Sequence, residues 1–354
     1  MPANFHVVLA SRPGVDGVPK IEHFRHESCP YPTGPLQPGE VIVKTLYLSV
    51  DPALRCCMNE DTGVHYLKPW LPGNTMRGLS GVGVIVESSS KRLEVGDLVE
   101  CALTWPWKTY YLRNADSYPP LNKVPDSLAE TPSMILSVFG GTALTALIGI
   151  REKAHIKRQT NQTVVVSAAA GSTGSFAGQF AKLEGCGKVI GICGTDEKKE
   201  YIVDELKFDG AINYKTENIA ERLQELCPDG VDVYFDNVGG EISNTVIQKM
   251  NKNSHIVLCG QISVYNKDET YPPALPADVR KYLDDNNITR ERFLVLNYID
   301  QFEAAVEQLM KWFINDNIKY RECIEEGLYN TGKAFVKMMS GGNIGKQIVH
   351  VDNP

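Results

Sequence analysis

The segment Thr163–Leu183, with the sequence TVVVSAAAGSTGSFAGQFAKL, decides how the rest of the chain is interpreted. It starts with the β-branched run Val164–Val166, which is typical of a buried strand. Small residues follow, and apolar side chains then recur at helical spacing, at Phe176, Phe180 and Leu183. The segment therefore predicts a strand, a tight turn and a helix.

The turn in this segment, Ala169–Gly174, fits the pattern G-x-G-x-x-G except that Ala169 stands first. Small residues let backbone N–H groups approach a pyrophosphate, and the N-terminus of the helix offers it partial positive charge. The residues predicted to bind a pyrophosphate are Gly171, Ser172, Thr173 and Gly174. The turn alone does not decide the matter, because similar turns open helices in proteins that bind no nucleotide.

Length and charge narrow the class of protein. The chain of 354 residues exceeds what one hydrophobic core usually serves, so we expect two domains. The net charge is −7, and basic residues form no run longer than a pair, which argues against a nucleic-acid partner. Polar residues interrupt the uncharged windows 131–150 and 159–181, and a signal-peptide pattern is lacking, so we expect no membrane partner. The 9 cysteines are odd in number and lack paired spacing, which argues against a disulfide framework and fits a reducing cytoplasm, and the absence of C-x-x-C argues against a redox dithiol.

The first 125 residues or so are rich in strand patterns. Apolar, β-branched runs at 41–50, 81–87 and 97–102 are separated by clusters of Pro and Gly. Glycine within and between these runs predicts a small, bent, barrel-like sheet.

The pattern changes after Pro125. Residues 127–150 are apolar and helix-like, and strands then alternate with helices. The expected strands are 164–167, 188–192, 211–214, 231–235, 255–258 and 293–296, and the expected helices are 197–206, 217–226 and 242–250. Such alternation predicts an α/β domain, a parallel sheet covered on both faces, in the doubly wound order of nucleotide-binding domains. After a polar excursion at 263–290, the tail holds a strand-like 318–320, a helix near 328–339 and a strand at 346–351.

In such sheets, ligands bind beyond the carboxyl ends of the strands. The second strand ends at Cys193-Gly194, where an NAD site usually places an acid, and Lys198 follows one turn later. Lys198 and the Tyr214 hydroxyl suit a 2′-phosphate, so the sequence favours NADPH as the cofactor. Two such bonds would supply about 3–6 kcal/mol, or roughly 10²-fold or more discrimination against NADH. The alternative is that Lys198 is a solvated charge, and an Asp196 side chain aimed at the ribose would also count against NADPH.

Two further glycine turns follow the fourth and fifth expected strands, at 236–240 and 259–263. Glycine permits a close approach of the backbone to a flat ligand such as nicotinamide, and Asn237 could reach a cofactor ribose. The alternative for each turn is a tight turn with no ligand. Cys259 could be a nucleophile, but beside a glycine at a strand end it is more often a small packing residue.

Metal and serine-nucleophile chemistry lack their sequence patterns. The 7 histidines include no H-E-x-x-H, no Cys/His cluster has zinc spacing, and no G-x-S-x-G is present. We therefore predict no metal site.

Several motifs together resemble the zinc-independent medium-chain dehydrogenase/reductases. The resemblance covers nearly the whole chain and rests on A-A-x-G-x-x-G after a strand, F-D-N-V-G-G at 235–240, C-G-x-I-S-x-Y at 259–265 and G-G-N-x-G-K at 341–346. Zinc-dependent members carry a Gly-His-Glu ligand motif, and the corresponding Arg77–Gly81 lacks both ligands.

The resemblance implies a Rossmann NADPH-binding domain, residues 127–316, inserted in a β-rich GroES-like catalytic domain, residues 1–126 and 317–354. It also implies NADPH-dependent reduction of the C=C bond of α,β-unsaturated ketones, notably 15-keto-prostaglandins. By its motifs, further cofactor contacts fall at Asn237, Cys259, Gly260, Gln261, Ile262, Ser263, Val264, Tyr265, Phe293, Leu294, Val295 and Asn343. Tyr66 and Tyr265 match tyrosines that face the substrate.

The chemistry implied is hydride transfer to the β-carbon, which places negative charge on the carbonyl oxygen. Tyr265 is the predicted catalytic residue, because a hydroxyl donor stabilises such an enolate; the alternative is a packing tyrosine. Leu103 and Thr104, with Ala53, depart from the family pattern and are predicted to alter the wall of the substrate pocket. A quinone reductase of the same superfamily and a non-catalytic NADPH-binding protein remain open, as do a monomer and a homodimer.

Overall fold

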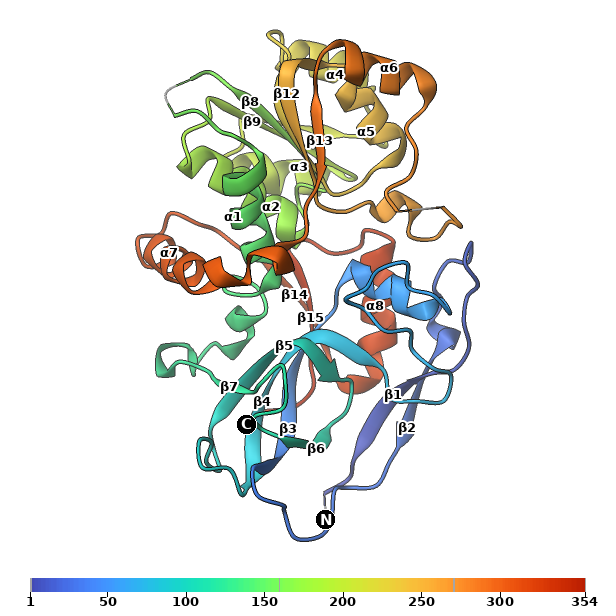
Figure 1. The fold of residues 1–354 in the computed structure, drawn as a ribbon, viewed down its shortest axis with the longest axis vertical. Helices are drawn as coiled ribbons and strands as arrows, with labels where there is room; N and C mark the ends of the chain where they lie inside the picture. Colours follow the sequence, from blue (N-terminus) through green and yellow to red (C-terminus); the bar gives the residue numbers. More distant parts are fainter. Residues whose placement is uncertain (1, 159, 270, 354) are drawn as a thin grey trace. The chain divides into compact units, whose positions relative to one another are not determined.

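The computed structural model describes residues 2–158, 160–269 and 271–353. Contacts divide the chain into two compact units (Figure 1). The flanking unit consists of Met1–Gly140 and Glu322–Pro354, and the inserted unit is Gly141–Arg321. The boundaries drawn from the sequence, at 126 and 316, stay predictions.

The inserted unit contains a parallel sheet with the strand order β10-β9-β8-β11-β12-β13. The strands are β8 (Thr163–Ser167), β9 (Lys188–Cys193), β10 (Gly210–Asn213), β11 (Val231–Asp236), β12 (Met250–Leu258) and β13 (Thr289–Arg292). Counted along the chain, this is the order 3-2-1-4-5-6, so the predicted doubly wound α/β fold is confirmed. β8 lies at the centre and all its residues are buried, which explains its continuous run of β-branched side chains.

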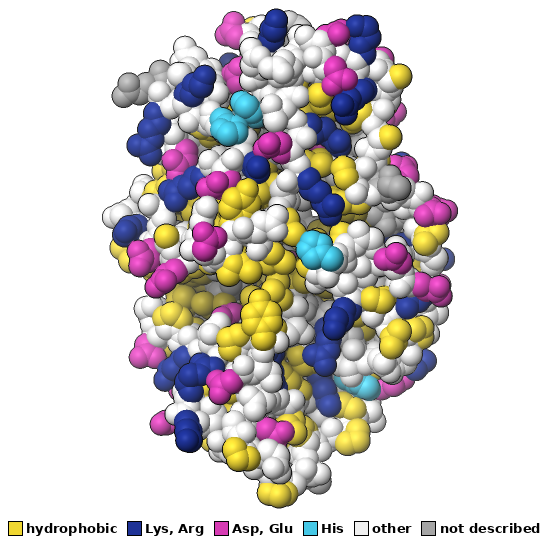
Figure 2. All heavy atoms as spheres, in the orientation of Figure 1, with side chains coloured by type: hydrophobic (Ala, Val, Ile, Leu, Met, Phe, Trp, Pro, Cys, Tyr) yellow, Lys and Arg dark blue, Asp and Glu magenta, His cyan; other side chains and the backbone are white. Residues whose placement is uncertain are grey.

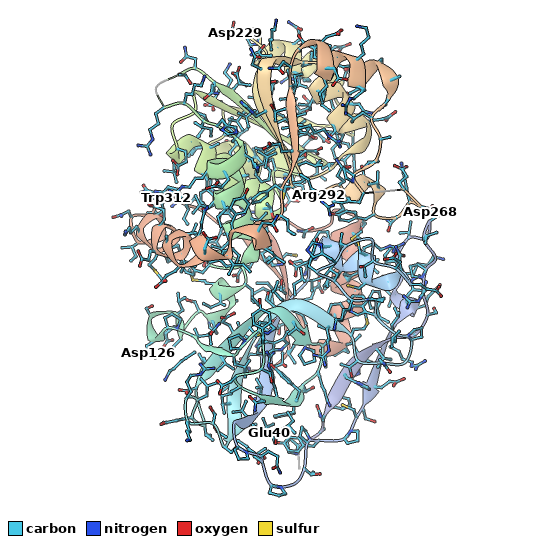
Figure 3. The ribbon with its side chains drawn as sticks, viewed as in Figure 1. Glu40, Asp126, Asp229, Asp268, Arg292 and Trp312 are labelled. Atoms are coloured by element: carbon cyan, nitrogen blue, oxygen red, sulfur yellow. The ribbon has the colours of Figure 1, made fainter. Side chains whose placement is uncertain are left out.

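Helices cover this sheet. They are α1 (Gly141–Lys153), α2 (Ser172–Leu183), α3 (Asp196–Glu200), α4 (Ile219–Leu226), α5 (Gly240–Ile247), α6 (Ala277–Asp285) and α7 (Phe302–Ile314). Figure 1 shows α4, α5 and α6 next to one another, and α1 contacts both α2 and α7. The ring of Trp312 on α7, labelled in Figure 3, stacks on Phe180 of α2 with ring centroids 5.2 Å apart. The helical spacing of Phe176 and Phe180 therefore marks the buried face of α2.

The predicted strand 293–296 is wrong. The last strand is the preceding segment β13, and the chain turns into a 3-10 helix, η7 (Val295–Gln301), after Phe293 and Leu294. As the last strand in the order, β13 pairs only with β12, so it tolerates polar residues. Phe293 is buried, and a Cβ on Gly149 of α1 would lie 3.1 Å from its ring. The apolar run therefore serves the core, not the sheet.

Three other predicted elements are also wrong, wholly or in part. Residues 318–320 form no strand, because the Gln179 side chain binds the backbone of Lys319 at both its N–H (2.7 Å) and its carbonyl (2.9 Å). The predicted helix 242–250 ends early, since α5 stops at Ile247 and Met250 already pairs in β12. Within 127–150, two 3-10 turns, Asp126–Leu128 and Pro132–Ile135, precede α1.

The flanking unit contains a mostly antiparallel sheet with the order β14-β15-β3-β4-β5-β7, and β6 pairs with β3. Its strands are β3 (Glu40–Ser49), β4 (Arg77–Ser88), β5 (Leu98–Pro106), β6 (Tyr110–Asn114), β7 (Asn122–Lys123), β14 (Glu322–Glu326) and β15 (Lys346–His350). β1 (Phe5–Leu9) pairs with β2 (Phe24–Ser28), and α8 (Thr331–Met339) contacts β15. Because β15 pairs with β3, the C-terminal segment belongs to the same sheet as the N-terminal one.

A buried ion pair joins these two segments of the flanking unit. The Lys346 ammonium lies 2.7 Å from Asp51, and it also donates to the Val50 carbonyl at 3.0 Å. The Ser49 hydroxyl donates to the other oxygen of Asp51 at 2.6 Å. Residues nearly three hundred positions apart in sequence thus meet in one buried cluster.

Candidate functional site

The turn between β8 and α2 has the form that its sequence predicts. A Cβ on Gly174 would lie 2.4 Å from the Ala168 carbonyl oxygen, so only glycine lets the helix start this close to the strand. A Cβ on Gly191 of β9 would come within 2.8 Å of the Ala169 methyl, which explains how alanine replaces the first glycine. The first N–H groups of α2 lack intrahelical acceptors, so this turn presents donors that fit a pyrophosphate.

The N-terminus of α1 meets the same turn, which the sequence did not indicate. The hydroxyls of Thr142 and Ser172 are 2.7 Å apart, and each residue stands at the start of its helix. A hydroxyl residue at the start of the preceding helix was the available signal, but nothing in the spacing connects it to α2. Thr142 therefore joins Ser172 as a candidate ligand contact.

The end of β9 carries the groups predicted for a 2′-phosphate. Gly194 lets the Tyr214 ring approach, since a Cβ there would lie about 3.0 Å from the ring and 3.1 Å from its hydroxyl oxygen. Lys198 is half-buried on α3, and Lys215 places its ammonium 6.0 Å from the centroid of the Tyr214 ring. Asp196 accepts from the Asn213 amide at 2.9 Å, so one of its oxygens is already bound within the protein. This cluster of cations and a tyrosine fits an anionic ligand.

A cavity of about 540 Å³ lies beyond the end of β10. α4, α5 and α6 supply most of its wall, including the polar side chains of Asn218, Thr245 and Gln248. Tyr214 contributes to the lining, which places the cavity next to the predicted phosphate-binding group.

The turns after β11 and β12 pack against each other. The carbonyls of Asn237 and Val238 accept from the N–H groups of Ile262 (3.3 Å) and Ser263 (3.0 Å). The Asn237 amide donates to the Ser167 carbonyl at 2.8 Å, so it also ties the ends of β11 and β8 together. The structure thus brings Asn237 and the 259–263 turn side by side. The Asn237 side-chain N–H donor is bound to the Ser167 carbonyl within the protein.

The structure shows why the chain has glycine at positions 239 and 240. Both have positive φ, 72° and 61°. A Cβ on Gly239 would lie 2.9 Å from the Gln261 side chain, and one on Gly240 would lie 2.9 Å from the Ser263 hydroxyl. These glycines therefore make room for the neighbouring turn, and a role in the approach of a flat ligand stays a prediction.

The Tyr265 hydroxyl lies at the carboxyl end of β12. It accepts weakly from the Gln261 N–H at 3.4 Å, and a Cβ on Gly260 would lie 3.4 Å from its oxygen. The short 3-10 helix η6 (Ile262–Val264) carries Tyr265 back over the start of its own turn. Burial raises the pKa of the Cys259 thiol to about 12, which fits a packing residue and not a nucleophile.

Of the other predicted cofactor contacts in the inserted unit, Val264 and Phe293 are buried, while Leu294 and Val295 are half-buried at the start of η7. Arg292, labelled in Figure 3 at the end of β13, lies over the ring of Tyr271 at 4.7 Å. The buried Phe293 side chain packs near Tyr298, so its predicted contact would have to come from its backbone.

Two of the predicted substrate residues in the flanking unit, Leu103 and Thr104, form a bulge in β5. Gly78 pairs with Trp105 and Ser80 with Ala102, so Leu103 and Thr104 together oppose the single residue Leu79. Leu103 has a φ of +71°, which is rare for a bulky residue, and bulges of this kind redirect side chains next to sites. Tyr66, Ala53 and Leu79 are partly buried against the same core cluster. Of the predicted departures from the family pattern, Leu103 and Thr104 thus coincide with an irregularity of the backbone.

Asn343 lies in the turn before β15 of the flanking unit. Its amide donates to the Gly345 carbonyl at 2.8 Å, which stabilises the turn. Its side-chain oxygen is the group that could contact a ligand.

Asp236 is the residue that the sequence reasoning missed most clearly. This carboxylate ends β11, is 1% exposed, and accepts from donors on both glycine turns. An acid closing an apolar strand was the available signal.

The described residues contain no group of three or more His, Cys, Asp or Glu side chains placed to hold a metal ion. Figure 2 shows acidic and basic side chains interspersed over one face. Every helix in the described parts of the chain is too short or too polar to cross a lipid bilayer.

Comparisons with known proteins match this geometry. Residues 6–120 match a family described as the N-terminal domain of oxidoreductase, and residues 172–311 match the zinc-binding dehydrogenase family. The chain is 41% identical to the putative NADP-dependent oxidoreductase YfmJ of Bacillus subtilis, over 98% of each chain. It is 38% identical to prostaglandin reductase 1 of Rattus norvegicus, over 94% of this chain and 95% of the relative.

A solved structure of CurA from Vibrio vulnificus in complex with NADPH is also similar. The two chains are 32% identical, with a TM-score of 0.89 and coverage of 99% and 100%. The Escherichia coli quinone oxidoreductase, at 19% identity and a TM-score of 0.73, shares the fold. Relatives of this identity and coverage show that the chain belongs to the medium-chain dehydrogenase/reductase family of oxidoreductases.

Proposed function

We propose that the protein reduces the C=C bond of α,β-unsaturated ketones with NADPH, and that 15-keto-prostaglandins, reduced at the 13,14 double bond, are its substrates. The motifs of the chain resemble prostaglandin reductase 2, the 15-oxoprostaglandin 13-reductase, and its relatives include prostaglandin reductase 1. In this proposal the substrate is a small lipid enone and the protein acts in the cytoplasm. It works as a monomer or homodimer, and neither nucleic acid nor a membrane is its partner.

NADPH is the cofactor of the proposed reaction, as it is in the CurA complex. The open start of α2 fits the pyrophosphate, and Lys198 with Tyr214 fits the 2′-phosphate. When bound, NADPH supplies the hydride that reduces the β-carbon of the enone.

The single observation that carries the proposal is the position of the Tyr265 hydroxyl. It lies over Gly260 at the carboxyl end of β12, on the same pair of turns as Asn237. A phenol donor suits the carbonyl oxygen of an enone, where charge develops during hydride transfer. Enone reduction then needs no strongly basic side chain, because solvent can protonate the α-carbon.

Substrate choice is assigned to the flanking unit. Tyr66 and Ala53 pack against the core cluster of this unit, as does Leu79, and Leu79 is the residue opposite the bulge at Leu103 and Thr104. We expect their shapes to set which enones fit.

The test is NADPH oxidation with a 15-keto-prostaglandin and with a quinone, in wild type and Tyr265→Phe. The proposal expects turnover of the enone, and a loss of about 10²–10³ in kcat in the variant. Tyr282→Phe is the matched control, because the Tyr282 hydroxyl donates to the Met250 carbonyl far along the strand from this turn.

Turnover of the quinone alone would favour a quinone reductase, and NADPH binding without turnover of either would favour a non-catalytic protein. A loss below about threefold in Tyr265→Phe would remove Tyr265 as the enolate donor.

A further inference from the structure

The buried Asp236 carboxylate is surrounded by donors on every side. Its Oδ1 accepts from the backbone N–H groups of Val238 (3.0 Å) and Gly239 (2.9 Å). The Tyr234 hydroxyl, two residues earlier on the same face of β11, also donates to Oδ1 at 3.0 Å. A carboxylate with this many donors is firmly fixed in place.

The second oxygen reaches the other turn. Asp236 Oδ2 accepts from the Ser243 hydroxyl at 2.5 Å and from the Gln261 amide nitrogen at 3.3 Å. The carbonyl of Asp236 accepts in addition from the N–H groups of Cys259 and Gly260, both at 3.0 Å. One residue therefore binds both glycine turns, with its two carboxylate oxygens divided between them.

Gln261 connects the Asp236 carboxylate to Tyr265. With its amide nitrogen facing Asp236, Gln261 leaves its oxygen buried with no partner among the described residues. The reverse orientation would place that oxygen against the carboxylate, so Asp236 determines how the amide is turned. The backbone N–H of the same Gln261 meets the Tyr265 hydroxyl at 3.4 Å.

We infer that Asp236 is a positioning residue, which acts through Gln261 to place the Tyr265 hydroxyl for catalysis. This inference rests on the proposed function, since it gives Asp236 a role only in the step that Tyr265 serves. The partners of Asp236 then have two different roles. The first turn is stabilised by Val238, Gly239, Tyr234 and Ser243, whereas Gln261 connects Asp236 to the second turn.

Asp236→Asn tests the link with little change of shape. The two rigid N–H groups of Val238 and Gly239 need an oxygen at Oδ1, so the new amide nitrogen takes the place of Oδ2 and faces the Gln261 amide nitrogen. Gln261 then loses its acceptor and must turn or move. Ser243→Ala is the matched control, because it removes a donor from the same oxygen but leaves the Gln261 contact intact.

The kinetic measurement is kcat for enone reduction, with the dissociation constant for NADPH measured separately. Asp236→Asn should lower kcat about tenfold at saturating NADPH; the dissociation constant is measured separately because residues 259–265, which Asp236 holds, are also predicted cofactor contacts. In a Tyr265→Phe background the same change should cost less than about threefold, since residues that act as a unit are not additive. A tenfold loss in that background as well, or an equal loss in Ser243→Ala, would overturn the inference.

Hydrogen exchange on the full chain gives a readout that needs no substrate. In Asp236→Asn, peptides covering 259–265 should exchange at least about tenfold faster, while Ser243→Ala leaves them unchanged. Unchanged exchange at 259–265 in Asp236→Asn would contradict the inference. If the wild type reduces no enone, the proposed function fails, and this exchange comparison still decides whether Asp236 holds the second turn.

If Asp236→Asn does not fold, Gln261→Met tests the same link from its other end. It should lower kcat by a similar factor, again with less than about a threefold effect in Tyr265→Phe. A kcat of Gln261→Met equal to that of wild type would overturn the inference.

Discussion

The turn Ala169–Gly174 and the paired turns 237–240 and 259–263 look alike in sequence but differ in physical design. The first is open: its closest constraint is the contact of Gly174 with the strand behind it, and the N-terminus of α2 has no side-chain cap hydrogen bond. The paired turns fill each other's space, with Gln261 against Gly239 and Ser263 against Gly240.

The difference shows that glycine has two separate uses at the carboxyl edge of one sheet. In the open turn it exposes N–H donors to a ligand. In the paired turns it makes room for protein side chains, and Asp236 takes up the N–H groups that a ligand would otherwise bind. We therefore assign phosphate binding to the open turn, and the placing of Tyr265 to the paired turns.

The largest effect is expected from Gly174→Ala. The new Cβ would lie 2.4 Å from the Ala168 carbonyl oxygen, and backbone cannot swing aside. We expect a loss of about 3 kcal/mol in stability, measured by urea unfolding, and at least roughly tenfold weaker NADPH binding. Gly171→Ala is the control, because its Cβ would meet the same oxygen at 3.2 Å and should cost about 1 kcal/mol or less. Equal losses in the two variants would contradict this account of the open turn.

Gly239→Ala should cost about 2 kcal/mol. Gly239 has φ 72° and ψ −165°, a conformation almost restricted to glycine, and the added Cβ also meets Gln261 at 2.9 Å. Gly260→Ala should cost less than about 1 kcal/mol, because its nearest contact would be 3.3 Å and its φ is not positive. Urea unfolding measures both, and a larger loss for Gly260→Ala would show that the paired turns are arranged differently.

Lys198→Ala should reduce the preference for NADPH over NADH by about 10- to 100-fold, the value of a charge-assisted bond of 1.5–3 kcal/mol. Lys199→Ala is the matched control, because the Lys199 ammonium is 2.7 Å from the Glu217 carboxylate and serves the fold. Its cofactor preference should change less than about threefold. KM values for both cofactors give the ratio, and an unchanged preference in Lys198→Ala would disprove its role.

The smallest effect is expected from Cys259→Ser, which should change kcat less than about twofold. With a pKa of about 12 instead of the usual 9.0, the Cys259 thiol stays protonated at pH 8. Its alkylation by iodoacetamide, followed by peptide mapping, should be slow there and should keep rising above pH 10, where an ordinary thiol has already ionised. Fast alkylation at pH 8 together with loss of activity would make Cys259 part of the chemistry.

The sequence was sufficient for the parts of the fold that depend on local patterns. The buried strand Val164–Val166, the Gly174 contact and the 3-2-1-4-5-6 strand order follow from β-branched runs and from alternation with helices. Tyr265 was proposed because its motif, C-G-x-I-S-x-Y, resembles that of the family, and its catalytic role stays a prediction. These features need only neighbouring residues to be recognised.

What could not be predicted depends on partners far apart in the chain. The backbone of Lys319 looks like a strand but is bound by the Gln179 side chain, 140 positions away. Thr142 meets Ser172 only because two helix starts converge, and Asp236 acquires its role from Gln261, 25 positions later. The strand was predicted at the apolar segment 293–296 and not at the polar β13 that precedes it. Side-chain hydrophobicity does not distinguish an edge strand from a core segment.

Transfer of deuterium from stereospecifically labelled NADPH to an enone tests the central claim most directly. The account predicts a saturated ketone that carries the label at the β-carbon, seen by NMR and mass spectrometry of the product, and a rate that falls about 10²-fold or more in Tyr265→Phe. An allylic alcohol with deuterium on the former carbonyl carbon, or no labelled product at all, would contradict it.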